Sequence, residues 1–180
     1  MATPGDPLIT LAVDGTPLDL QVAAYLATDT DPTVGLVPAL GQRMDDSGAR
    51  SGANSIYPNY LTDGPTSDRD ACPTPFVVVA PGGVRGVDKL TREARVIVEI
   101  HDTGDAGRTR WPGIVRRVKW LLTRNSWFPL LNGEYSYISG LALDDESPPG
   151  LHDDRYNTDV TQIILSVKAS DVTSGGGINR

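Results

Sequence analysis

The stretch that decides the fold is Ala94-Arg95-Val96-Ile97-Val98-Glu99-Ile100-His101 in a chain of 180 residues. Its even-numbered positions are all apolar, whereas its odd-numbered positions include Arg95, Glu99 and His101. A period of two residues is that of a β-strand with one face buried and the other nearer to solvent. The sequence therefore predicts a half-buried strand over these residues.

Three further segments on either side of this stretch predict strands. Residues 160–169 alternate in the same way, and residues 76–80 form a short apolar run of strand length. The turn signal Asn132-Gly133 precedes a fourth segment, residues 134–143. Residues 81–86 lie between the predicted strands at 76–80 and 94–101. They are rich in glycine, and we expect a turn or hairpin loop there.

Two segments have the spacing of amphipathic helices. The first is expected to start at Thr16 and Pro17, which suit a cap and a first helical position, and the second at Pro112. Apolar residues three or four apart give each helix one buried stripe. These stripes are Leu18, Val22, Tyr25 and Leu26 in the first helix, and Ile114, Val118, Leu121 and Leu122 in the second.

Polar loops are predicted between these elements. Residues 43–74 are rich in Asp, Ser, Gly, Asn and Pro, and only Ile56, Tyr57, Tyr60 and Leu61 suggest a short strand among them. A loop of this length is unusual in a compact domain unless it contacts something. Residues 101–110 are a second polar loop.

The order of elements predicts an α+β fold. Only the link through the second helix looks long enough for a parallel crossover, so we expect a mainly antiparallel sheet with two or more helices packed on one face. The length suits a single domain, residues 1–172, followed by a flexible, glycine-rich tail at residues 173–180.

Charge and composition narrow the function classes. The net charge is −7, which argues against a protein dominated by nucleic-acid binding. Residues 85–124 nevertheless carry ten Lys/Arg against five Asp/Glu, which indicates either a surface for an acidic partner or an ordinary solvated helix face. We expect no membrane span, no secretory signal and synthesis in the cytoplasm. The single cysteine, Cys72, is expected to be inert.

Three segments contain residue types that could carry out chemistry or bind a metal ion. The pair His101-Asp102 and the group His152-Asp153-Asp154 contain potential metal ligands, but nothing in their spacing brings three ligands together. Asp144-Asp145-Glu146 can serve acid–base chemistry or bind calcium, although an exposed acidic loop is favoured. We therefore expect no catalytic, cofactor or metal site and no enzymatic activity.

The layout resembles that of the tail terminator (tail completion) proteins of long-tailed bacteriophages. Four pieces, which together cover most of the chain from Leu18 to Ala169, carry the resemblance. They are the opening helix with Val22-Ala23-Ala24-Tyr25-Leu26 and Asp31-Pro32-Thr33-Val34-Gly35-Leu36-Val37, the strands Phe76-Val77-Val78-Val79 and Ala94 to His101, the helix Ile114 to Leu122, and the loop Pro148 to Tyr156 before the last strand.

The resemblance implies a structural virion protein. Such a protein forms a homohexameric ring that caps the tail tube, ends its polymerisation and joins the tail to the head or neck. Its partners would be other copies of itself, the tail tube protein and a head or neck connector protein, with nucleic acid at most passing through the ring lumen. The location would be the head–tail junction of the virion.

A ring needs two complementary patches on each copy. Our hypothesis is that Arg116, Arg117 and Lys119 meet the acidic residues Asp144, Asp145 and Glu146 of a neighbouring copy. Three alternatives stay open: another neck, connector or baseplate component, a small metal-dependent hydrolase that uses the histidines, and a module that contacts nucleic acid.

Overall fold

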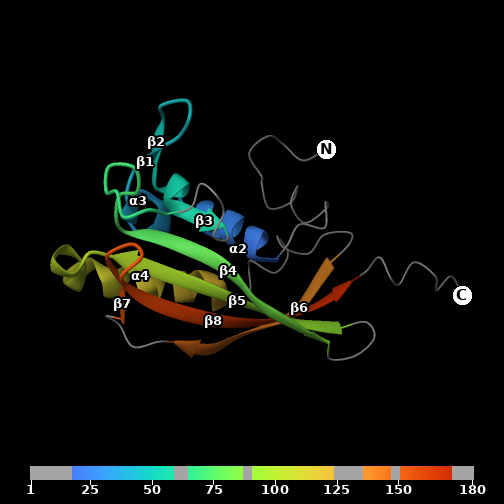
Figure 1. The fold of residues 1–180 in the computed structure, drawn as a ribbon. Coiled ribbons are helices and arrows are strands. Elements are labelled where there is room, and N and C mark those ends of the chain that lie inside the picture. The colour runs from blue at the N-terminus through green and yellow to red at the C-terminus, as the bar shows by residue number, and fades with distance from the viewer. Residues whose placement is uncertain (1–17, 59–64, 87–90, 124–135, 147–150, 172–180) are drawn as a thin grey trace, which may run out of the picture.

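The computed structural model describes residues 18–58, 65–86, 91–123, 136–146 and 151–171. These residues form an α+β fold, as predicted, with a main sheet and a separate two-stranded hairpin (Figure 1). The helices are α2 (Leu18–Ala27), α3 (Leu36–Ala39), the 3-10 turn η1 (Gly52–Ser55) and α4 (Gly104–Thr123). The strands are β1 (Arg43–Met44), β2 (Arg50–Ser51), β3 (Ile56–Pro58), β4 (Phe76–Gly86), β5 (Thr91–Asp102), β6 (Ser136–Glu146), β7 (Leu151–Asp153) and β8 (Thr158–Asp171).

The strand predicted at residues 94–101 is confirmed as part of β5. It lies inside the sheet order β3-β4-β5-β8-β6, while the short β7 also pairs with β8. Its two neighbours are antiparallel to it, and Val98 sits opposite Val79 on β4 and Ile163 on β8. Because both neighbours satisfy its backbone groups, alternation within this segment was a reliable signal.

Two pairs of strands in the main sheet run parallel to each other. Strands β5 and β6 both pair antiparallel with β8, so they run parallel to each other and α4 is the crossover between them, as expected. Strand β3 also pairs parallel with β4, with Tyr57 opposite Val78. We expected only the link through the second helix to be long enough for a parallel crossover. That expectation was wrong, because residues 59–75, between β3 and β4, are also long enough for one.

Helices α2 and α4 pack together on one face of the sheet (Figure 1), which confirms the predicted arrangement. The core there joins side chains from both helices to inward-facing residues of β4, β5 and β8. Fully buried members include Val22, Leu26, Leu36, Val77, Val79, Val98, Val118, Leu122, Ile163 and Leu165. No helix in the described part of the chain is both long enough and apolar enough to span a membrane.

The opposite face of the sheet carries a second, smaller apolar cluster. It contains Tyr57, Cys72, Phe76 and Val78, with Tyr156 packed against it. His101 is fully buried beside this cluster, and its ring stacks on Phe76 at 4.6 Å between centroids. The alternation placed His101 on the strand face nearer to solvent, but it is buried because the 65–75 segment and the β7–β8 turn cover this end of the sheet.

Residues 81–86 continue strand β4 rather than forming the expected loop. A register shift between Pro81 and Gly83 breaks the ladder to β5. Strand β3 pairs with β4 only as far as Val79, so Pro81 follows the part of β4 that is paired with β3 and lies at the register shift, a position where strands tolerate proline. Gly83 has a φ of +103°, which glycine adopts without strain.

Helix α4 begins at Gly104, eight residues before the expected start at Pro112, and includes most of the predicted loop 101–110. Two contacts hold its early turns on the sheet. Arg110 donates to both carboxylate oxygens of Asp102 at 2.8 and 3.0 Å, and Trp111 donates to the Thr161 hydroxyl at 3.0 Å. These tertiary bonds offset the loss of one helical hydrogen bond at Pro112.

The predicted long loop, residues 43–74, contains short regular elements as well. Strands β1 and β2 form a hairpin, η1 follows directly, and Ile56–Pro58 forms β3, which confirms the suspected strand over its first two residues. The other two residues suspected there, Tyr60 and Leu61, lie outside the described residues. Acidic residues 144–146 were expected in a loop, but their backbone belongs to strand β6, so that expectation was wrong.

Candidate assembly surface

A groove of about 500 Å³ lies between the α2–α3 connection and the outer side of α4. Its apolar lining comes from both segments, and three arginines surround it. The residues that matter below are Val34, Leu36, Ile114, Arg116, Arg117 and Trp120. We call this feature the arginine–tryptophan groove.

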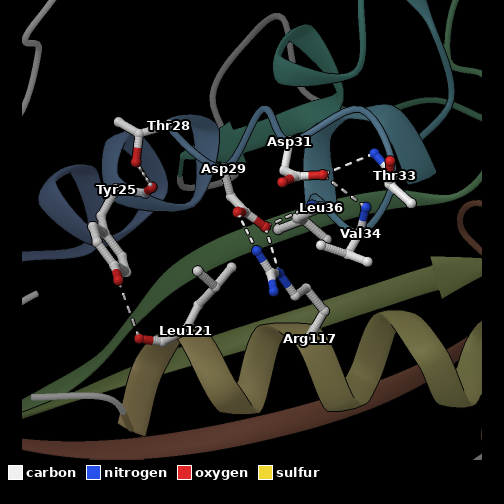
Figure 2. Close-up of polar contacts among 9 residues, drawn as sticks. All are labelled: Tyr25, Thr28, Asp29, Asp31, Thr33, Val34, Leu36, Arg117 and Leu121. Atoms are coloured by element: carbon white, nitrogen blue, oxygen red, sulfur yellow. Dashed lines mark hydrogen bonds and ion pairs between the residues drawn. The ribbon is translucent and has the colours of Figure 1, made fainter. Parts of the chain in front are cut away.

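One wall of the groove is a tight turn capped by Asp31. The Asp31 Oδ1 atom accepts hydrogen bonds from the backbone N–H of Thr33 at 2.8 Å and of Val34 at 3.1 Å (Figure 2). These bonds hold the pKa of Asp31 below its ordinary value. A Cβ at Gly35 would lie 2.5 Å from the Asp31 carbonyl oxygen, so only glycine fits there. The turn leaves the Val34 side chain at the rim, 58% exposed.

An ion pair ties this wall to the helix. Arg117 donates from Nε to Asp29 Oδ2 at 2.7 Å and from Nη2 to Asp29 Oδ1 at 2.6 Å, a two-pronged geometry. Asp29 Oδ2 also accepts from the backbone N–H of Leu36 at 2.6 Å (Figure 2). The carboxylate therefore joins the α2–α3 connection, the start of α3 and the middle of α4. We call this set of contacts the Asp29–Arg117 clamp.

The clamp changes the ionisation of its members. Burial raises the pKa of Asp29, but the hydrogen bonds from Arg117 and Leu36 outweigh it and leave that pKa below the ordinary 3.8. The hydrogen bond to Asp29 raises the pKa of Arg117. Both groups are thus held in their charged forms.

The helix side of the groove is aromatic and cationic. The Arg117 guanidinium carbon lies 4.4 Å from the centroid of the Trp120 ring, which stacks the cation on the indole. Trp120 is nevertheless 46% exposed, and Arg116, one helical turn before it, is exposed. Arg116 forms no ion pair with any residue in the described ranges. An exposed tryptophan beside a guanidinium is a combination enriched at binding hot spots.

The free energy of unfolding should depend on pH, because folding lowers the pKa of the Asp29 carboxylate in the clamp. The folded pKa of Asp29 lies below its unfolded value, so its contribution is complete above the unfolded pKa and is lost as the pH falls through the folded pKa. We expect urea unfolding between pH 6 and pH 2.5 to show a shallower loss of stability for Asp29→Asn than for the wild type. Identical pH slopes would contradict the role of this carboxylate.

The predicted interface residues are only partly brought together. Arg116 and Arg117 line the groove, but Arg117 is already paired with Asp29 within the chain. Lys119 is on the same helix, half-buried and outside the groove lining. The side chains of Asp144, Asp145 and Glu146 lie outside the described residues, so their pairing with the arginines of another copy stays a prediction.

Sequence reasoning missed the apolar half of the groove. Trp120 follows Arg116 by four residues and Arg117 by three, so helical spacing alone could have placed all three on one face. No pattern in the sequence distinguishes the exposed Val34 from the buried apolar residues that follow it, Leu36 and Val37. The pairing of Asp29 with Arg117 joins residues 88 positions apart, and no local signal points to it.

The two histidine-containing segments that were considered as sources of metal ligands do not meet at one site. His101 Nδ1 lies 2.9 Å from the Thr158 hydroxyl and Nε2 lies 3.5 Å from Glu99 Oε2, whereas Asp102 faces Arg110. His152 lies elsewhere, with Nδ1 at 3.2 Å from Asp159 Oδ1 and Nε2 at 3.5 Å from Asp154 Oδ1. Within the residues that the structure describes, no three His, Cys, Asp or Glu side chains are grouped to hold a metal ion.

The cysteine is buried, which agrees with the core location considered for it. Cys72 is 2% exposed, and its sulfur accepts a hydrogen bond from the Tyr57 hydroxyl at 3.2 Å. Burial and this bond raise the pKa of Tyr57, so the phenol remains a donor. A buried thiol with a phenol donor is a packing arrangement.

Compared with models of known protein families and with curated protein sequences, the chain matches none.

Proposed function

We propose that this chain is a self-assembling structural protein whose copies associate through the arginine–tryptophan groove. Within that class, we propose a tail terminator: a ring that caps the tail tube of a long-tailed bacteriophage, ends tube polymerisation and offers a docking surface to the head or neck. The observation that carries the proposal is the groove itself, with Trp120 and Val34 exposed beside Arg116.

The physical argument concerns what such a groove does in water. Leaving a valine and a tryptophan half-exposed side by side keeps apolar surface in contact with solvent, which a partner would bury at about 25 cal/mol per Å². The Arg116 charge adds direction to that contact, because only an acidic partner residue complements it. The groove walls are preorganised by the Asp29–Arg117 clamp and the Asp31 cap, so little ordering is needed on binding.

The arrangement of the sheet gives independent support. Strands β4, β5 and β8 are 11, 12 and 14 residues long, and their distal ends extend beyond α2 and α4 (Figure 1). This part of the sheet is separate from the groove, and a head-to-tail ring requires two different regions on each copy. The order of elements is also the one on which the resemblance to tail terminators rests.

The test is tube growth with purified components. Tail tube protein from the same virion is polymerised with and without the chain, and tube lengths are measured by negative-stain electron microscopy. We expect the chain to shorten the tubes and to be found at their ends. Trp120→Ala should abolish this at concentrations where Leu151→Ala, a change at another exposed apolar residue, leaves it intact.

Two results would count against the proposal. Unchanged tube lengths together with no binding to tubes would rule out a terminator. Binding to a connector or baseplate protein in the same assay, without binding to tubes, would assign the chain to another joint of the virion.

A further inference from the structure

We propose that the arginine–tryptophan groove of one copy receives the β1–β2 hairpin of the next copy, with Met44 placed on Trp120 and Val34 and the Asp46 carboxylate paired with Arg116. The inference rests on the proposed function in one respect, which is that identical copies associate head-to-tail. It identifies the two surfaces that would make the contact.

The hairpin is a rigid projection. It stands away from the sheet at one end of the molecule (Figure 1). Asp45 Oδ1 accepts hydrogen bonds from the Ser47 hydroxyl at 2.7 Å and from the backbone N–H groups of Ser47 and Ala49 at 2.9 Å each. Gly48, with a φ of +86°, closes the turn by donating to the Asp45 carbonyl at 3.0 Å. A tip fixed in this way loses little entropy on binding.

The base of the hairpin is also fixed. Arg43 donates to the Asn54 carbonyl at 3.3 Å, and the Asn54 side chain donates back to the Arg43 carbonyl at 3.1 Å. These bonds join β1 to η1. The hairpin therefore keeps its direction relative to the rest of the chain.

The tip presents one exposed apolar side chain and one exposed acidic side chain. Met44 is 54% exposed. Asp46 is exposed, and it forms no ion pair with any residue in the described ranges, whereas the neighbouring Asp45 is used to cap the turn. Met is a flexible side chain that adapts to aromatic surfaces through its sulfur.

The groove presents the complementary pair at a matching spacing. Arg116 and Trp120 are four residues apart on α4, which places their Cβ atoms about 6 Å apart on one face. Met44 and Asp46 are two residues apart, which spans at most about 7 Å. An apolar contact and an ion pair can thus form together. We call the β1–β2 hairpin the knob. Because the knob and the groove are different surfaces, the contact is head-to-tail and closes into a ring if the rotation between copies allows it.

The experiment uses two charge reversals on the full chain, with mass in solution measured by sedimentation velocity over a range of concentrations. Asp46→Lys breaks the knob and Arg116→Glu breaks the groove, and each is expected to weaken self-association at least about 10-fold. Asp70→Lys, an equal change at another exposed aspartate, should leave it unchanged. The double variant, with the charges exchanged, should recover association.

Mixing the two single variants gives the sharpest result. In the mixture, the hairpin of each variant meets a groove of opposite charge on the other variant, so both contacts can form in alternation and association should recover although neither variant associates alone. A mixture that stays monomeric, or single variants that assemble like the wild type, would overturn the inference.

If the wild type is monomeric in solution, cross-linking tests the same contact. Cys72 is 2% exposed, so a short bismaleimide should join only introduced thiols. Asp46→Cys mixed with Arg116→Cys should cross-link well above the control mixture of Asp70→Cys with Arg116→Cys. Equal yields would overturn the inference. Tube capping is scored separately, so a failed knob–groove contact in a protein that still caps tubes leaves the proposed function standing.

Discussion

Replacing Phe76 with alanine is expected to lower the free energy of unfolding by about 3–5 kcal/mol. Phe76 is 0% exposed and is the centre of the second cluster. Its ring stacks on His101 and meets the rings of Tyr57 and Tyr156 edge-on, at 5.8 and 5.9 Å between centroids. The alanine variant leaves a cavity lined by three rings that strands β3, β4 and β5 and the β7–β8 turn hold apart.

Urea unfolding at neutral pH, followed by tryptophan fluorescence, measures this loss. Leu151→Ala is the surface control, and we expect it to stay within about 0.5 kcal/mol of the wild type. A double-mutant cycle with Tyr156→Ala should show coupling, because the two rings are in contact. A loss below about 1 kcal/mol for Phe76→Ala would show that this end of the sheet is not a packed core.

Breaking the Asp29–Arg117 clamp is expected to cost about 2–3 kcal/mol, less than a fully buried pair because both side chains retain some exposure. Asp29→Ala leaves the Arg117 guanidinium without a carboxylate and the Leu36 N–H without an acceptor. The remaining contact of Arg117 with Trp120 does not replace an anionic partner. The α2–α3 connection should therefore detach from α4.

The clamp can be separated from local turn effects. Asp31→Ala removes the acceptor for Thr33 and Val34 in the same connection but leaves the hydrogen bonds between Asp29 and Arg117 in place, so its loss should be clearly smaller. A cycle of Asp29→Ala with Arg117→Gln should show coupling, and additive losses would contradict the clamp. Because the clamp positions the groove, Asp29→Ala should also weaken self-association, as Arg116→Glu does.

Local pattern was enough for the elements whose period is unbroken. The alternation around Val98 and around Ile163 predicted β5 and β8, and the 3.6-residue stripe through Val118 predicted the second half of α4. Each of these segments has a neighbour that buries one side, so the hydrophobic pattern and the observed burial agree.

Local rules failed where a distant partner changed the outcome. Pro112 suggested a helix start, yet Arg110 reaches Asp102 and Trp111 reaches Thr161, so α4 extends in front of the proline. His101 ends a half-polar strand in the sequence but is buried under Tyr156, which comes from the β7–β8 turn. In both cases the deciding contact joins residues far apart along the chain or on different elements.

The sequence pattern likewise predicts one part of the candidate site, and tertiary contacts decide the other part. The identity of Arg116 and Arg117 as outward-facing cations on a helix follows from their spacing, and so do the α+β class and the sheet with helices on one face. The groove itself does not follow from spacing, because it needs Asp29 and Arg117, 88 residues apart, to meet and hold the Val34 turn beside Trp120. Periodicity is a property of neighbouring residues, whereas a groove exists only between segments that the folded chain brings together.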